Sequence, residues 1–162
     1  MDILKLATTR TISNDAIALS LLISDNTAFD STDVVMQEFA NVELLIFRNK
    51  NELAKSKLKK LLDENPGHSI SDEIFWLQSK LALQEGEYLI AIEKLDKIIK
   101  GYSYDILSDD AFYKKGVIIQ DYLNQEEEAM MIFQEFLKSH PGSMYAAEAR
   151  QRIRSIRGDL VN

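Results

Sequence analysis

The chain of 162 residues suits a single domain, and its 46% hydrophobic and 28% charged residues are typical of a folded protein, not of a disordered one. Its formal net charge of −7 opposes binding to nucleic acid or to an anionic membrane, because such binding needs basic side chains that neutralise phosphates. Cysteine is absent, which excludes disulfides and thiolate metal sites.

The N-terminal part carries two helical patterns, a short one over residues 3–7 and a longer one over residues 13–24. Residues 16–23 are apolar nearly all round, which is typical of a helix covered on more than one side. We expect upstream repeats, or a second copy of the chain in a homodimer, to cover this end. No apolar run approaches the roughly 20 residues of a membrane span, so we expect no direct membrane insertion.

The centre of the chain repeats one pattern three times, with apolar residues at positions i, i+4, i+7 and i+8. This spacing places them on one face of an α-helix. The sets are Ala54, Leu58, Leu61 and Leu62, then Ala91, Leu95, Ile98 and Ile99, and finally Ala129, Phe133, Phe136 and Leu137. Their alanines lie 37 and 38 residues apart. Such a period, with two helices in each unit, is the signature of an α-solenoid.

Another helical stretch precedes each alanine set and begins with a residue type that commonly caps helices. The three stretches run over residues 33–47, 71–84 and 108–122, starting at Asp33, Ser71 and Ser108. Asn49 and Asn124 begin segments that resemble capping boxes for the second helix of a pair, whereas Gly86 supplies a tight turn in the middle repeat. Pro66 and Pro141 end two of the alanine-set helices.

We therefore predict an all-α domain, a right-handed α-solenoid of antiparallel helix pairs with about seven or eight helices. Its parts are N-terminal flanking helices at 1–30, repeats at 31–66, 71–103 and 108–141, and a C-terminal capping helix at 143–157.

The capping helix has one apolar side and one charged side, as a solenoid end exposed to water requires. Its apolar stripe consists of Ala146, Ala149, Ile153 and Ile156. Arg150, Arg154 and Arg157 line the other side, and Gly158 is expected to end the helix as its C′ residue.

The repeats resemble the tetratricopeptide repeat family over about residues 34–157. The family pattern has an aromatic residue, a small residue four later, Gly and Tyr before an Ala, then an aromatic and a closing Pro. The middle repeat matches it with Phe75, Ser79, Gly86, Tyr88, Ala91 and Leu95. The third matches with Phe112, Gly116, Ala129, Phe133 and Pro141, with one extra residue in its turn. The first repeat departs from it, because Glu38 stands where an aromatic is expected, although Ala54, Leu58 and Pro66 match.

Two further features qualify the resemblance. The family prefers a small residue seven positions after the alanine, where this chain has Leu61, Ile98 and Phe136, so we expect a looser variant with longer turns. The segment from His140 to Arg150 also resembles the closing repeats of bacterial envelope proteins, including tetratricopeptide lipoproteins of outer-membrane assembly and periplasmic partners of the Tol–Pal system. The protein would be periplasmic as a fragment of an exported protein, and cytoplasmic otherwise.

The resemblance implies a partner-binding groove, because four positions of the first helix in each family repeat face the concave side. These positions correspond to Phe39, Glu43, Ile46 and Phe47, then to Trp76, Lys80, Leu83 and Gln84, and finally to Tyr113, Val117, Gln120 and Asp121. Aromatic anchors among polar groups are typical of peptide-binding grooves. The alternative is that Trp76 packs between repeats, although Phe75 already fills the packing position.

Other reactive side chains have structural explanations. His68 and His140 lie beside Pro-Gly turns, where we expect solvent-exposed residues instead of metal ligands. The acids at 126–128 fit the first turn of a helix, whose dipole favours them, and the lysines at 55–60 fit a solvated face. The arginines at 150–157 suit carboxylate binding, although cations near a helix C-terminus are favourable in any case.

The sequence has no phosphate loop, nucleophile elbow, metal motif or dinucleotide fingerprint, so we expect neither enzymatic activity nor a cofactor. We interpret the chain as a protein–protein interaction scaffold that presents a concave groove to a partner protein or peptide. Two alternatives stay open: a structural spacer from a longer repeat protein, and a regulatory domain of a larger chain.

Overall fold

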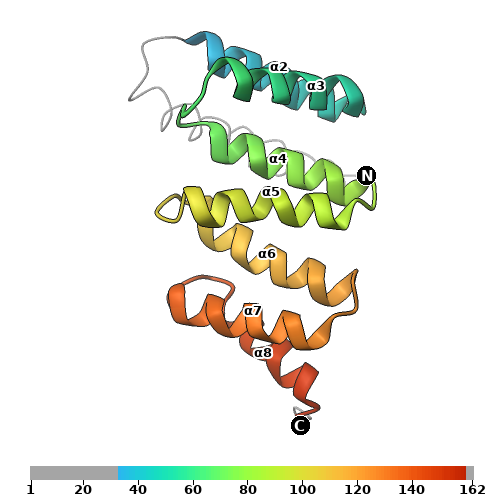
Figure 1. Cartoon of the computed structure of the whole chain (residues 1–162), viewed down its shortest axis with the longest axis vertical. Coiled ribbons are helices and arrows are strands. Elements are labelled where there is room, and N and C mark those ends of the chain that lie inside the picture. Colours follow the sequence, from blue (N-terminus) through green and yellow to red (C-terminus); the bar gives the residue numbers. More distant parts are fainter. Residues whose placement is uncertain (1–32, 160–162) are drawn as a thin grey trace, which may run out of the picture. The chain divides into compact units, whose positions relative to one another are not determined.

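The computed structural model describes residues 33–159, and these residues form seven α-helices and no strand (Figure 1). The helices are α2 (Asp33–Phe47), α3 (Asn51–Glu64), α4 (Ser71–Gln84), α5 (Tyr88–Gly101), α6 (Leu107–Asp121), α7 (Glu126–Ser139) and α8 (Ala146–Arg157). The predicted all-α repeat fold is therefore confirmed, while the helices predicted at 3–7 and 13–24 lie outside the described residues. Within the described part of the chain, no helix has both the length and the apolar character of a membrane span.

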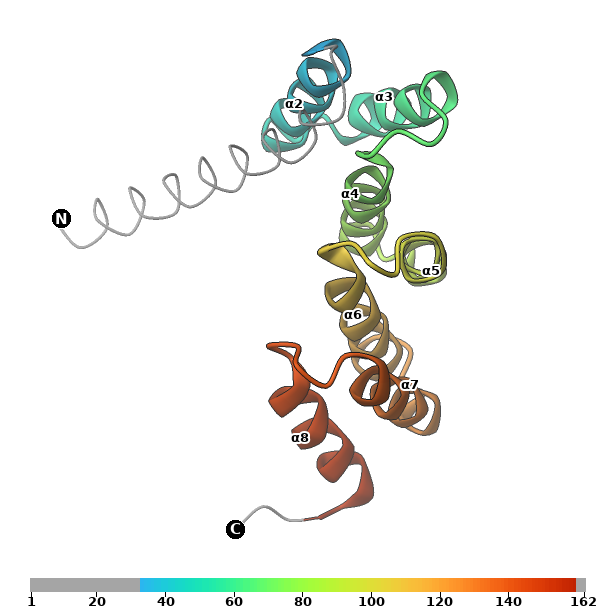
Figure 2. The same cartoon turned by 90° about the vertical axis from the view of Figure 1, so that its left-hand side faces the viewer.

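The chain divides into two compact units between Ile70 and Ser71. Helices α2 and α3 pack against each other in the N-terminal unit, and α4 to α8 form the C-terminal unit. In the C-terminal unit each helix packs against the next one, and α4 also contacts α6. Figure 2 shows the result: α4, α6 and α8 lie in one layer, and α5 and α7 lie in the other. Two layers of helices allow each apolar stripe to be buried between neighbours.

The alanine sets form the core that the sequence predicts. In each set the first three residues are buried and the fourth is half-buried. Small residues bring α6 and α7 close together, since a Cβ atom added at Gly116 would lie only 2.5 Å from the ring of Phe133. A larger residue at 116 would therefore push the two helices apart. The bulky residues at the seventh position, including Phe136, are buried as well.

The turns inside the helix pairs are closed by residues with positive φ, not by capping boxes. Asn49, Gly86 and Asn124 have φ values of 56°, 78° and 54°. In this left-handed conformation each of them ends the helix before it, as Gly and Asn commonly do. The prediction that Asn49 and Asn124 open capping boxes is wrong, because the N-cap positions are Lys50 and Gln125, which make no side-chain capping hydrogen bond.

The predicted N-cap Ser108 is also wrong. Helix α6 begins one residue earlier, at Leu107, so the Ser108 side chain lies inside the first turn and is buried. Ser71 likewise lies within α4 and is buried. Both serines are small residues that are buried in the first turn of a helix. The sequence pattern alone assigned such residues to helix capping.

Helix α8 begins three residues later than the predicted 143, because Ser143 makes tertiary contacts. Its hydroxyl donates to the Asp109 carboxylate of α6 at 2.7 Å and accepts a hydrogen bond from the Tyr145 amide. At the other end, Gly158 has φ 74° and terminates the helix as predicted.

An ion pair explains the departure of the first repeat from the family pattern. The Glu38 carboxylate accepts a hydrogen bond from Lys57 at 2.9 Å, between α2 and α3. This bond and the charge of Lys57 lower the pKa of Glu38. A polar pair thus replaces the expected aromatic packing, and its exposed position makes it a weak source of stability.

Candidate partner-binding face

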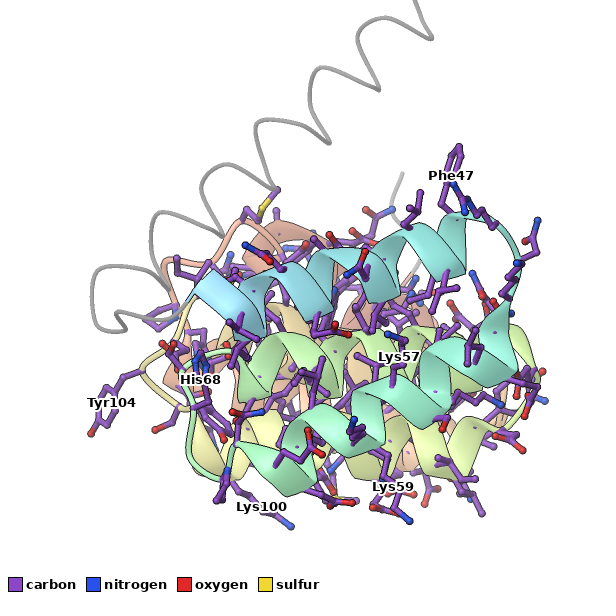
Figure 3. All side chains as sticks on the ribbon, turned by 90° about the horizontal axis from the view of Figure 1, so that it is seen from above. Phe47, Lys57, Lys59, His68, Lys100 and Tyr104 are labelled. Carbon is purple, nitrogen blue, oxygen red and sulfur yellow. The ribbon has the colours of Figure 1, made fainter. Side chains whose placement is uncertain are left out.

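The predicted site residues of the N-terminal unit differ in exposure. The Phe39 side chain is 1% exposed and belongs to the core. Glu43 is half-buried, while Phe47 at the end of α2 is 84% exposed. Figure 3 shows the Phe47 ring pointing away from its helix into solvent. Among the three, Phe47 offers the most apolar surface to a partner.

Trp76 of α4 is half-buried and packs against the apolar core that α4, α5 and α6 share. Its carbonyl accepts a hydrogen bond from the Ser79 hydroxyl at 2.7 Å. Lys80 and Gln84 follow at spacings of four residues and are exposed, which places them on the same side of the helix. The Trp76 ring therefore contributes to packing while part of it stays accessible.

Tyr113 of α6 is buried, with 7% exposure, although the family pattern places it in an open groove. Its ring stacks on Tyr145 with centroids 4.5 Å apart and an interplanar angle of 4°. It also lies 5.8 Å from the ring of Phe133. Burial raises the pKa of Tyr113 to about 12, because the ionised phenol would lose its hydration. The Tyr113 ring is thus part of the core of the C-terminal unit.

Arg152 of α8 holds the end of α6 through three hydrogen bonds. Its Nε donates to the Tyr113 hydroxyl at 3.1 Å, and its Nη1 donates to Gln120 at 2.7 Å and to Asp121 at 2.9 Å. Although burial opposes the charged form, the bonds to Asp121 and Tyr113 raise the pKa of Arg152. A planar guanidinium with several partners orients both helices. Arg152 therefore has a structural role, while Arg150, Arg154 and Arg157 are exposed.

An open hollow of about 630 Å³ lies between the end of α6 and the side of α8. Its lining residues are Gln120, Met144, Ala147, Glu148, Gln151, Arg152 and Ser155. Gln120 is the only predicted site residue among them. Val117 is half-buried and Asp121 is exposed beside the hollow, held by Arg152. We call the exposed and half-buried surface of α4, α6 and α8 the α4–α6–α8 face.

Sequence reasoning missed the part of this face that α8 contributes, because it treated α8 as a cap. Ala147, Gln151 and Ser155 lie 34 residues after Tyr113, Val117 and Asp121. That interval is the length of a tetratricopeptide unit. The interval was therefore a usable signal that α8 occupies the place of the first helix in a further pair.

Residues 110–143, from α6 to the turn before α8, match the family model described as tetratricopeptide repeat. Residues 110–143 are therefore a tetratricopeptide repeat, and the all-α repeat fold of the described residues is tetratricopeptide-like. The fold of this tetratricopeptide-like protein is similar to a solved structure described as "MamA RS-1 ArsTM double mutant", with a TM-score of 0.54 and 15% sequence identity over 93% of each chain. At this identity the likeness concerns the fold. No curated protein matched the sequence.

The histidines of the tetratricopeptide-like protein are turn residues, but they are half-buried and not solvent-exposed as predicted. His140 stacks on Phe136 with ring centroids 5.6 Å apart, and its Nδ1 lies 2.8 Å from the Ser139 hydroxyl. The His68 Nδ1 accepts a hydrogen bond from the Ile70 amide. The His140 ring thus packs on α7, and the His68 ring is bonded within its own turn. Within residues 33–159 no group of three or more His, Cys, Asp or Glu side chains is arranged to hold a metal ion.

Proposed function

We propose that this tetratricopeptide-like protein is a docking scaffold, and that an extended segment of a partner protein binds its α4–α6–α8 face. The observation that carries the proposal is the hollow beside Arg152. Its walls come from two helices that a hydrogen-bonded guanidinium holds in place. A preorganised surface loses less conformational entropy when a partner binds.

The polar groups of the face suit a polypeptide main chain. Gln84, Gln120 and Gln151 supply amides on α4, α6 and α8, and each amide can both donate and accept hydrogen bonds. The charges of Glu148 and Arg152, which form an ion pair at 3.5 Å, balance each other within the hollow. Such a lining favours peptide groups over a strongly charged ligand. We propose that the protein acts through this binding and not through catalysis.

Three further predicted site residues are proposed as secondary contacts, whereas the buried Phe39 and Tyr113 are not. Trp76 and Lys80 extend the face along α4, and Phe47 offers an exposed aromatic ring in the N-terminal unit. The predicted homodimer or upstream repeats would act through residues outside the described range, and the envelope location likewise stays a prediction.

Site-specific photo-crosslinking tests the proposal. We would place p-benzoylphenylalanine at Gln151, in the hollow, and compare it with the same residue at Met131, which is 60% exposed on α7. Discrete adducts with a small set of proteins from the native source are expected only for position 151. Equal adduct patterns at both positions would show that the face has no preference for partners.

A further inference from the structure

The turns of both helix pairs in the C-terminal unit lie at one edge, on the right in Figure 1. Tyr88 at the start of α5 and Tyr122 after the end of α6 bring these turns together, with ring centroids 4.9 Å apart. We call residues 85–90 and 121–128 the turn edge. It does not contribute to the lining of the hollow beside Arg152.

The turn edge exposes large apolar side chains. Leu89 is 72% exposed, and Ile90 and Tyr122 are each 44% exposed. The next residue, Ala91, is fully buried, whereas most of the Leu89 side chain lies outside the core. Clustered apolar side chains in contact with water commonly mark an interaction surface.

The charges around this apolar group have one sign. Six acidic side chains of the turn edge are exposed: Glu85, Glu87, Asp121, Glu126, Glu127 and Glu128. Neither segment contains Lys or Arg, and Arg152 of α8 forms an ion pair with Asp121. The helix dipoles of α5 and α7 favour Glu87, which is the N-cap residue of α5, and the acids at 126–128, but they do not account for the exposed Leu89.

We propose that the turn edge binds a basic amphipathic segment of a partner protein. The apolar side chains of that segment would cover Leu89 and Tyr122, and its lysines or arginines would meet the surrounding carboxylates. Complementary charges would select the partner and raise its association rate, and the apolar contact would supply most of the binding free energy. An anionic membrane or a nucleic acid would be repelled by the same carboxylates. This surface shares Asp121 with the α4–α6–α8 face and otherwise lies outside it.

Two labelled peptides test the inference: an amphipathic helical peptide of leucine and lysine, and its counterpart with glutamate in place of lysine. Fluorescence anisotropy would measure their binding to the full chain. The lysine peptide is expected to bind at least about tenfold more tightly than the glutamate peptide. Absence of binding by the lysine peptide, or equal binding of both peptides, would overturn the proposal.

Two pairs of variants separate this site from general attraction to an acidic protein. Leu89→Ser should weaken binding of the lysine peptide about fivefold or more, whereas Ile106→Ser, at a residue 78% exposed on the α5–α6 loop, should not. Glu87→Gln with Glu127→Gln should weaken it more than Asp63→Asn with Glu64→Gln, which changes the net charge equally on α3. Equal effects within both pairs would show that the turn edge is not the site.

Discussion

Arg152 of α8 and Asp121 of α6 lie 2.9 Å apart, although 30 residues and the whole of α7 separate them in the sequence. The same guanidinium also binds Gln120 and the Tyr113 hydroxyl. This contact fixes α8 against α6 and shapes the hollow between them.

Arg152→Ala should lower the free energy of unfolding by about 1–3 kcal/mol, because it leaves partly buried acceptors without their donor. Urea unfolding would measure the loss. Arg154→Ala is the matched control, since Arg154 is exposed on the same helix and its loss should stay within about 0.5 kcal/mol. Equal losses for both variants would contradict a structural role of Arg152.

Gly116→Ala should cost about 1–3 kcal/mol, because the added methyl group would lie 2.5 Å from the Phe133 ring in a closely packed core. Gly142→Ala is the control, as no heavy atom lies within 4 Å of a Cβ at that position. Thermal unfolding of both variants would compare them. Adding Phe133→Leu should recover part of the loss in the first variant, and additive losses would argue against this contact.

Trp76→Ala should cost about 1–3 kcal/mol, less than the roughly 3–5 kcal/mol expected for a fully buried aromatic such as Phe133→Ala. Trp76 packs on the core with only part of its ring, whereas Phe133 is 0% exposed. Chemical unfolding followed by circular dichroism suits both variants, because the chain has only one tryptophan. A loss equal to that of Phe133→Ala would remove Trp76 from the binding face.

Stability should fall as the pH rises from about 10 toward 12, because the pKa values of Tyr113 and Tyr145 are both raised from 10.0 to about 12. The unfolded chain releases these protons first, so the stabilisation is complete below pH 10 and is lost as the pH approaches the folded-state value. For Tyr145 the main cause is its hydrogen bond to Asp110, and for Tyr113 it is burial.

Urea midpoints at pH 9, 10 and 11 would measure this effect. The double variant Tyr113→Phe with Tyr145→Phe should lose less stability over this range than the natural chain. Tyr104→Phe is the control, because the Tyr104 side chain is fully exposed (Figure 3). A pH dependence that the double variant leaves unchanged would contradict the assignment.

Local sequence periodicity was enough to predict the helices and the core. Apolar residues at helical spacing predicted the seven helices of the described range, and the bounds of α2 and α4 were predicted without error. They also predicted the alanine sets, whose first three residues are buried in the structure. These features follow from local periodicity, because a helix buries one side whatever its neighbour is. Gly158 was also predicted correctly, because the end of a helix depends on the local backbone conformation that a glycine allows.

The contacts of the side chains on the α4–α6–α8 face depend on the packing of helices that are distant in the sequence. Tyr113 lies at a groove position of the family pattern, yet Tyr145 and Arg152 cover it. Ser143 was expected to begin a helix, but its hydroxyl binds Asp109, 34 residues earlier. Helical spacing gives the side of a helix on which a residue lies, whereas burial depends on which distant helix packs there. Which helix packs there depends on the contacts of many residues, so no local sequence pattern could predict it.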